Sequence, residues 1–197
     1  MSTHMTSVMF DFFGVVWSEV GTPWFLKHFS PERALEIRET YCPPSDKGEM
    51  SEDVFFNTIG ALVHACGDDV RSEWIDAVQL NQDVVSLVRD LKKHYKVAGL
   101  SNSQPAFFRD IMEKFSLGGL FDDVVVSSEV GLIKPNKEIF DFILTRLGAA
   151  PYETIFIDDR ESNVAAAENI GMRGIVFQNA TQLRNDLSAL GLLLSDR

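Results

Sequence analysis

The sequence of 197 residues predicts an α/β protein, a doubly wound parallel sheet with a small helical cap inserted after the first strand. Three observations support this fold class. Short apolar runs recur without alternating polar residues, which is typical of strands buried on both faces. Amphipathic helical patterns separate the later runs, as they do in βαβ units. A long stretch between the first and second runs has helical patterns and no good strand.

The first predicted strand is SVMFD at residues 7–11, and its last residue is an acid. Asp11 stands among apolar residues, where a lone carboxylate is unfavourable because it loses its hydration. We therefore expect a cation to lie beside this carboxylate and to compensate its charge.

Residues 17–85 form the predicted cap domain, and residues 1–16 and 86–197 form the predicted core domain. SPERALEIRETY is expected to start a cap helix, because Ser30 suits an N-cap and a proline follows it at the first helical position. A second cap helix is expected in SEDVFFNTIGALVHACG, because Ser51 suits an N-cap and acids follow it. The segment CPPSDKG at residues 42–48 is expected to be a loop within the cap.

Helical patterns and strands alternate in the rest of the predicted core domain. NQDVVSLVRDLKKH leads from the cap into the core, and the later helical patterns are QPAFFRDIMEKFSL, NKEIFDFILTRLG and SNVAAAENIG. Gly148 and Gly171 are expected to end two of these helices, since glycine favours the left-handed conformation there. The remaining predicted strands are KVAGLSNS (96–103), DVVVSSE (123–129), TIFIDD (154–159) and GIVFQN (174–179).

Composition and charge exclude several classes of function. The formal net charge of -11 argues against nucleic-acid binding, which needs clustered Lys and Arg, and against attraction to anionic membranes. No apolar run is long enough for a membrane span or a signal peptide, so the expected location is the cytosol. Cys42 and Cys66 are expected to be free thiols, because their spacing fits neither a disulfide framework nor a zinc site.

Polar residues follow the carboxyl ends of three predicted strands, and ligands bind at that edge of an open α/β sheet. These residues are Asp11, Ser101, Asn102, Asp158 and Asp159. Lys134, in GLIKPNKEIF, follows the third strand at the start of a helix and can reach the same edge. The sequence therefore predicts one crevice that holds carboxylates, a hydroxyl, an amide and a lysine.

Carboxylates gathered in one crevice repel each other and raise one another's pKa unless cations lie among them. Lys134 and a divalent metal would supply the positive charge. Oxygen ligands without His or Cys select Mg²⁺, which often binds one or two carboxylates together with a substrate phosphate. Metal, lysine and hydroxyl groups suit phosphoryl oxygens, and a remaining carboxylate can act as a nucleophile that forms an aspartyl-phosphate.

Four motifs follow one another across nearly the whole chain: FDFFGVV, LSNS, GLIKP and FIDDRESNVAAAENIGM. In this order, with a cap-sized gap after the first, they resemble the haloacid dehalogenase (HAD) superfamily. The closest resemblance is to subfamily IA hydrolases with a helical cap and a paired acid in the fourth motif. It implies a Rossmann-like core, Mg²⁺ as cofactor and a small phosphorylated substrate such as a sugar phosphate. Whether the chain is a monomer or a homodimer stays open.

The resemblance also implies roles for residues at the predicted crevice. Asp11 would be the nucleophile and a metal ligand, with Asp159 as a second ligand and the backbone carbonyl of Phe13 as a third. Ser101 and Asn102 would bind phosphate oxygens.

The implied roles of three further residues concern positioning and charge. Lys134 would be catalytic and substrate-binding, because it would bridge the nucleophile and the phosphate. Asp158 would support Lys134, and Asn163 would lie behind the metal ligands.

Phe13 departs from the family, in which most phosphatases have a second Asp at this position. That Asp protonates the leaving group and later activates water. Such acid–base catalysis typically raises the reaction rate by about 10²- to 10⁴-fold. Three hypotheses remain: a phosphatase that uses another proton donor or good leaving groups, a weak or silent binding or regulatory protein, and a metal-independent 2-haloacid dehalogenase. Asp158 and Asp159 argue against the dehalogenase, because without a metal they would repel the nucleophile.

Overall fold

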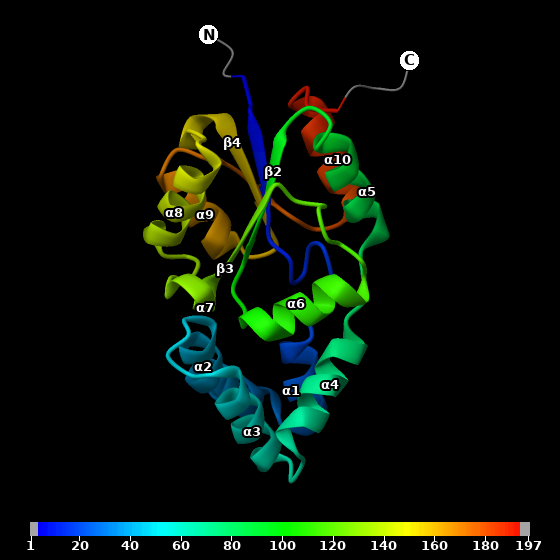
Figure 1. The fold of residues 1–197 in the computed structure, drawn as a ribbon, viewed down its shortest axis with the longest axis vertical. Helices are drawn as coiled ribbons and strands as arrows, with labels where there is room; N and C mark the ends of the chain where they lie inside the picture. Colours follow the sequence, from blue (N-terminus) through cyan, green and yellow to red (C-terminus); the bar gives the residue numbers. More distant parts are fainter. Residues whose placement is uncertain (1–3, 194–197) are drawn as a thin grey trace.

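The computed structural model describes residues 4–193, so the first and last residues of the predicted core domain lie outside the described part. It contains the strands β1 (Ser7–Phe10), β2 (Lys96–Ser101), β3 (Asp123–Val126), β4 (Thr154–Asp158) and β5 (Arg173–Val176). These strands form one parallel sheet in the order β3-β2-β1-β4-β5 (Figure 1). The predicted α/β fold is therefore confirmed, and β1 lies at the centre of the sheet.

Helices cover both faces of the sheet, and each face has its own apolar cluster (Figure 1). Val8 and Phe10 of β1 belong to one cluster, and Met9 between them belongs to the other, as expected when alternate residues point to opposite faces. Since both faces of β1 are covered, its residues are apolar throughout rather than alternating. The helices are α5 (Gln82–Leu91) and α10 (Ala180–Ala189) on one face, and α8 (Lys137–Leu147) and α9 (Glu161–Asn169) on the other.

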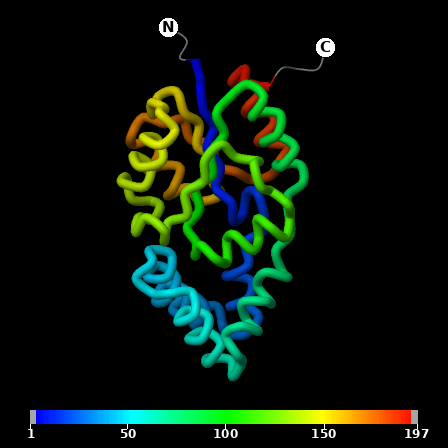
Figure 2. The backbone as a smooth tube through the Cα atoms, viewed as in Figure 1, coloured from blue at the N-terminus to red at the C-terminus, as the bar shows by residue number. Residues whose placement is uncertain are grey.

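Four helices lie together at one end of the molecule, beyond the carboxyl ends of the strands (Figures 1 and 2). They are α1 (Gly21–His28), α2 (Pro31–Asp46), α3 (Glu52–Leu62) and α4 (Gly67–Ala77). We call them the helical layer. Figure 2 follows the chain from β1 into this layer and back to the sheet through α5. The expected N-caps are present, because the hydroxyls of Ser30 and Ser51 accept hydrogen bonds from Arg33 N and Val54 N.

Helix α6 (Pro105–Lys114) follows β2 and lies between the sheet and the helical layer (Figure 1). Its Phe107 packs against Phe56 of α3 and Trp74 of α4, with ring centroids 5.6 and 6.1 Å apart. The helical layer is therefore joined to the core by apolar contacts as well as by the chain itself.

The predicted loop at residues 42–48 was wrong for most of its length, because α2 continues through Pro43 and Pro44 to Asp46 and only the last two residues form a turn. Each proline lacks the N–H that a helix needs, so local rules favour a break. Bonds from distant residues stabilise this last turn instead. Gln104 Nε2 donates to Ser45 Oγ at 2.9 Å and also to the Ser45 carbonyl.

The predicted strand at residues 123–129 was too long, because β3 ends at Val126 and a short helix, α7 (Ser127–Val130), follows it. The two serines explain the difference. Ser127 Oγ accepts a hydrogen bond from Ser103 N at 3.0 Å, and Ser128 Oγ donates to the Ser103 carbonyl at 2.6 Å. These side chains tie the chain to the loop after β2 and turn it away from the sheet.

Other local predictions are confirmed. Gly148 and Gly171 have φ values of 59° and 94° at the ends of α8 and α9. Cys42 and Cys66 are free thiols. Within residues 4–193, none of the helices combines the length and the apolar character that a membrane span requires. A single 3₁₀ turn in the described part, η1 (Pro151–Glu153), leads into β4.

Candidate active site

The candidate site lies at the carboxyl end of the central strand. Asp11 directly follows β1, and its backbone N–H donates to the Ile157 carbonyl of β4 at 2.8 Å, which continues the ladder for one residue. β1 also pairs with β2, so the chain after β2 and the chain after β4 flank Asp11 from both sides. The parallel topology thus brings the polar strand ends together, as the sequence predicts.

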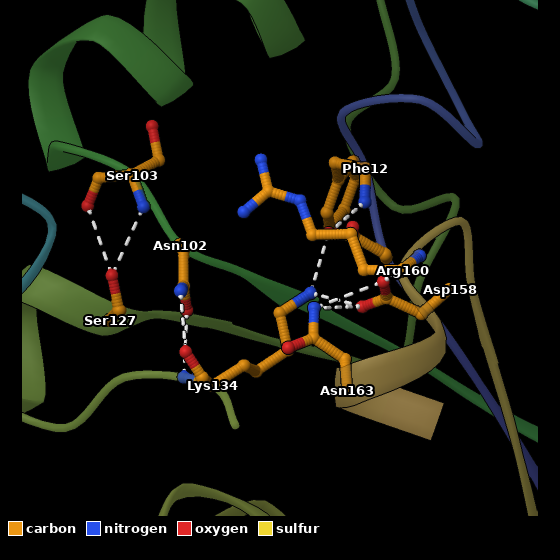
Figure 3. Close-up of polar contacts among 9 residues, drawn as sticks. Phe12, Asn102, Ser103, Ser127, Lys134, Asp158, Arg160 and Asn163 are labelled. Atoms are coloured by element: carbon orange, nitrogen blue, oxygen red, sulfur yellow. Dashed lines mark hydrogen bonds and ion pairs between the residues drawn. The ribbon is translucent and has the colours of Figure 1, made fainter. Parts of the chain in front are cut away.

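Lys134 and Asp158 form the buried centre of the site (Figure 3). Lys134 Nζ lies 2.7 Å from Asp11 Oδ1 and 2.7 Å from Asp158 Oδ2. Asn163 Nδ2 lies 3.0 Å from both Asp158 oxygens, and the Arg160 backbone N–H donates to Asp158 Oδ1 at 2.9 Å. Asp158 is therefore fully engaged, and it holds Lys134 in place.

The electrostatics of Lys134 are dominated by two opposing effects. Burial disfavours its charged ammonium, but Asp11 and Asp158 outweigh that effect and raise the pKa of Lys134 above its usual value. Lys134 therefore stays charged across the physiological pH range and supplies the cation expected beside Asp11.

Asp11 is buried and keeps one carboxylate oxygen free. Its Oδ1 accepts from Lys134 Nζ and from the Phe12 backbone N–H, the latter at 2.7 Å. None of the described residues forms a hydrogen bond with Oδ2. Burial is the main cause that raises the pKa of Asp11 to about 7; Lys134 opposes it, and the nearby Asp158 adds to it. A further cation at this carboxylate would favour its ionised, nucleophilic form.

Three carboxylates fit a divalent metal at this position. One oxygen each from Asp11, Asp158 and Asp159 lies within 4.8 Å of the others. Asp159 Oδ1 is buried and has no hydrogen-bond partner among the described residues, which is costly unless a cation binds it. Burial, with Asp158, raises the pKa of Asp159 as well. Since Asp158 is already engaged by Lys134 and Asn163, Asp11 and Asp159 are the carboxylates that would hold Mg²⁺.

The loop after Asp11 packs directly on Asp159. Gly14 has φ of 85°, and a Cβ placed on it would lie only 2.5 Å from Asp159 Oδ2. Glycine is required here both for this conformation and for the close approach. The loop that carries Phe13 is thereby held against Asp159, and the role of the Phe13 carbonyl as a metal ligand stays a prediction.

Ser101 and Asn102 end up in different environments. Ser101 is fully buried at the end of β2, and its hydroxyl has no hydrogen-bond partner in the described part of the chain. Asn102 exchanges two hydrogen bonds with the Lys134 backbone, through Nδ2 to the carbonyl at 3.0 Å and from the N–H to Oδ1 at 2.9 Å (Figure 3). Asn102 thus positions the Lys134 loop, and the phosphate contacts expected of both residues stay predictions.

A cavity of about 350 Å³ separates this ionic cluster from the helical layer. Asp11, Lys134 and Asn163 line it on the core side. On the side of the helical layer, Phe25 of α1 lines it, whereas Trp17, at the end of the loop after β1, is buried against Phe12 and Phe108.

Asp46 is a cavity residue that the sequence analysis missed. It lies at the end of α2, is half-buried, and forms no ion pair or side-chain hydrogen bond with any described residue. Burial raises the pKa of Asp46 to about 7, although Arg160 and Lys134 act in the opposite direction. A signal did exist in the sequence, because an acid in the last turn of a helix opposes the helix dipole. That signal was lost when the segment was assigned to a loop.

The model of the haloacid dehalogenase-like hydrolases matches residues 5–171 of the chain. Sesquiterpene phosphatase astK of Aspergillus oryzae is 26% identical over 182 residues, which is 89% of this chain and 91% of that protein. Drimenol cyclase drtB of Aspergillus calidoustus is 24% identical over 150 residues, or 73% of this chain, but the chain spans only 28% of that protein's length.

Solved structures share the fold. HAD family enzyme bt-2542 of Bacteroides thetaiotaomicron, in complex with magnesium and inorganic phosphate, has a TM-score of 0.74 at 20% identity, covering 89% of this chain and 95% of that chain. L-2-haloacid dehalogenase of Xanthobacter autotrophicus has a TM-score of 0.65 at 18% identity, covering 94% of this chain and 83% of that chain. At these identities the likeness establishes the architecture, and the chemistry has to be argued from the site.

Proposed function

The chain belongs to the haloacid dehalogenase-like hydrolases, and from this premise we propose that it is a Mg²⁺-dependent phosphatase of small phosphate monoesters. Asp11 is the proposed nucleophile, and an aspartyl-phosphate is the intermediate. Relatives named as phosphatases support this reaction class. The sugar phosphate expected from the sequence stays a prediction about the substrate.

The observation that carries the proposal is the orphaned Asp159 Oδ1 beside the Asp11 carboxylate. Lys134 pairs with Asp11 and Asp158, and Arg160 acts on Asp159, so three acids still outnumber two cations in the cluster. A divalent cation held by Asp11 and Asp159 would remove this imbalance. A metal-independent dehalogenase has no use for Asp159, which would repel its nucleophile.

The structure also bears on the hypothesis of a silent binding or regulatory protein, in which the Phe13 ring would fill the site. The Phe13 ring packs against Phe107 with parallel planes, 6.2 Å between centroids, and leaves the cavity of about 350 Å³ open beside Asp11. Phe13 is therefore part of a wall of the cavity rather than a plug, so a phosphate ester has room to reach Asp11.

In the proposed reaction Asp11 Oδ2 attacks phosphorus while the bond from phosphorus to the leaving oxygen breaks, and the leaving oxygen takes up a proton. Lys134 offsets the negative charge of the nucleophile and of the phosphoryl oxygens. Asp11 and Asp159 would hold the metal, which would supply further positive charge for the phosphoryl oxygens. A water molecule then attacks phosphorus, which releases inorganic phosphate and restores Asp11.

Asp46 is our candidate for the missing proton donor. It lines the cavity that Asp11 and Lys134 line, from the helical layer opposite them, and no described residue pairs with its carboxylate. An acid–base group works best when its pKa is near the working pH, and the pKa of Asp46 is raised to about 7. Its charged and titratable neighbours are Arg160 and Lys134 of the core and Cys42 one turn earlier on α2.

The first test is hydrolysis of p-nitrophenyl phosphate with Mg²⁺ and with EDTA. Its leaving group needs little protonation, so the result does not depend on Asp46. We expect turnover that requires Mg²⁺ and that the Asp11→Asn variant loses. If the wild-type protein releases no more phosphate than this variant, the phosphatase proposal is wrong, and halide release from 2-haloacids becomes the assay to run.

A further inference from the structure

The cavity beside Asp11 has an aromatic wall opposite its ionic wall. The aromatic residues come from five parts of the chain: the loop after β1, three helices of the helical layer, and α6. All of them are buried except Phe13, which is half-buried. The aromatic wall consists of Phe13, Phe25, Phe55, Phe56, Trp74 and Phe107.

These rings form one continuous surface. Phe13 stacks on Phe107 with centroids 6.2 Å apart and an interplanar angle of 2°. Phe107 is 5.6 Å from Phe56, which is 5.5 Å from Trp74. Trp74 in turn is 5.7 Å from Phe25. The aromatic wall therefore runs from two residues beyond the nucleophile into the middle of the helical layer.

The aromatic wall offers little to a polar ligand. Its one polar atom among the described residues is Trp74 Nε1, which is buried and has no hydrogen-bond partner. Polar side chains line the cavity beside this wall, namely Glu19, Thr22, Arg38, Glu39, Gln104 and Arg160. Arg38 Nη1 donates to Thr22 Oγ1 at 2.9 Å, and Gln104 Nε2 donates to Ser45 Oγ and to the Met50 carbonyl, both at 2.9 Å. Sugar hydroxyls placed against these rings would lose their bonds to water without replacement. Apolar carbon would instead gain by leaving water.

We propose that the alcohol portion of the substrate is an apolar or aromatic group that lies against the aromatic wall, so that the enzyme cleaves hydrophobic phosphate monoesters. This inference rests on the proposed phosphatase function and deepens it. It also gives Phe13 a role, because a ring replaces the usual acid at the point where the leaving group begins.

The cavity volume sets the size of this group. About 30 Å³ is one water molecule's share of liquid volume, so a cavity of about 350 Å³ holds roughly a dozen groups of that size. A phosphate takes about five of these places by its atom count, which leaves roughly seven for the alcohol. A phenyl ring or a six-carbon chain fits this space.

The test is the series ethyl, butyl and hexyl phosphate, assayed by phosphate release with Mg²⁺. The alcohols have nearly equal acidity, so the chemistry is constant and only the apolar area changes. We expect kcat/KM to rise about threefold to fourfold per methylene, or roughly 100-fold from ethyl to hexyl. Glycerol phosphate is the polar comparison for butyl phosphate, and we expect it to react at least about tenfold more slowly.

A pair of variants assigns the effect to the aromatic wall. Phe25→Leu should flatten the chain-length dependence, because it removes ring surface, whereas the matched change Tyr152→Leu at an exposed ring should not. The series itself needs no variant, so the inference can be tested even if Phe25→Leu folds poorly.

The outcomes separate the two proposals. If p-nitrophenyl phosphate is hydrolysed but the alkyl series is flat, or glycerol phosphate is preferred, the apolar substrate is wrong and the phosphatase stands. If none of these esters, including p-nitrophenyl phosphate, is hydrolysed above the Asp11→Asn background, both proposals fall together.

Discussion

The two walls of the cavity are built from opposite kinds of interaction. On the core wall, Asp158 alone receives Lys134 Nζ, Asn163 Nδ2 and the Arg160 backbone N–H. On the helical-layer wall, rings pack against rings, and Asp46, a half-buried acid that lines the cavity from α2, has no partner among the described residues. The core wall is thus fixed before any substrate arrives, whereas the other wall is shaped by apolar packing that tolerates changes of shape.

This difference indicates that the core wall carries out most of the reaction, whereas the rings of the helical-layer wall determine which substrates fit. A hydrogen-bonded ionic cluster loses much of its stability when one member is removed, because the remaining charges are left buried. An apolar wall can exchange rings for other apolar groups at little cost if the volume is kept. We therefore expect substitutions on the core wall to impair the reaction with every ester, and substitutions of rings on the helical-layer wall to change which esters react.

The largest expected effect is on the core wall, in Lys134→Met. This change leaves Asp11 and Asp158 as buried neighbours without their shared cation, so we expect a loss of about 3–5 kcal/mol in the free energy of unfolding. Urea denaturation without metal measures it. Lys137→Met is the matched control, because Lys137 pairs with Asp141 on the surface and should cost less than about 1 kcal/mol. If both variants lost the same free energy of unfolding, the ionic cluster of the core wall would contribute no more stability than a surface ion pair, and the contrast between the walls would be wrong.

The second prediction concerns proton donation by Asp46. Asp46→Asn keeps the shape of the side chain but cannot give up a proton, so hydrolysis of hexyl phosphate should fall by about 100-fold or more. Hydrolysis of p-nitrophenyl phosphate should change little, because its leaving group is acidic. Glu36→Gln, an exposed position on the same helix, is the control for general effects of a lost charge. A similar fall with both esters would mean that Asp46 is structural.

A smaller effect is expected on Mg²⁺ binding in Asp159→Asn. The amide is a weaker ligand than the carboxylate, so the Mg²⁺ concentration that gives half of the maximal thermal stabilisation should rise by about tenfold to 100-fold. Without Mg²⁺ the variant should be no less stable than the wild type, because a repelling charge is gone. Asp141→Asn on the surface provides the control. An unchanged Mg²⁺ midpoint would remove Asp159 from the metal site.

The core wall could be predicted from the sequence for a simple reason. Parallel strands deliver their carboxyl ends to one edge, so Asp11, Asp158 and Lys134 could be placed together without knowing any side-chain packing. The strands themselves were visible as apolar runs that end in polar residues. Even the engagement of Asp158 with Lys134 follows the role implied by the resemblance.

The helical-layer wall could not be predicted in the same way. Whether Phe56 and Trp74 face a cavity depends on how α3 and α4 pack against each other and against α6, which their own helical patterns do not determine. Asp46 was missed because two prolines before it indicate a break, and the bonds that keep α2 intact come from Gln104, more than fifty residues away. Local rules fail where tertiary hydrogen bonds replace local ones.

The smallest expected effect is on stability, and it tests whether Asp46 is truly unpaired. Burial, opposed by Arg160 and Lys134, raises the pKa of Asp46 from 3.8 to about 7, so the folded protein favours the protonated form. This contribution to stability is present at low pH and is lost as the pH rises from about 4 to about 7.

Asn, in contrast to Asp, stays neutral at every pH. The Asp46→Asn variant should therefore match the wild type at about pH 4 and be more stable at pH 8 by about 1–2 kcal/mol, because solvent screens a half-buried group and reduces the full effect. Thermal unfolding at both pH values measures this difference. A variant that is less stable at pH 8 would show that the ionised Asp46 is paired after all, with Arg160 as the nearest candidate, and the contrast between the two walls would then be one of degree.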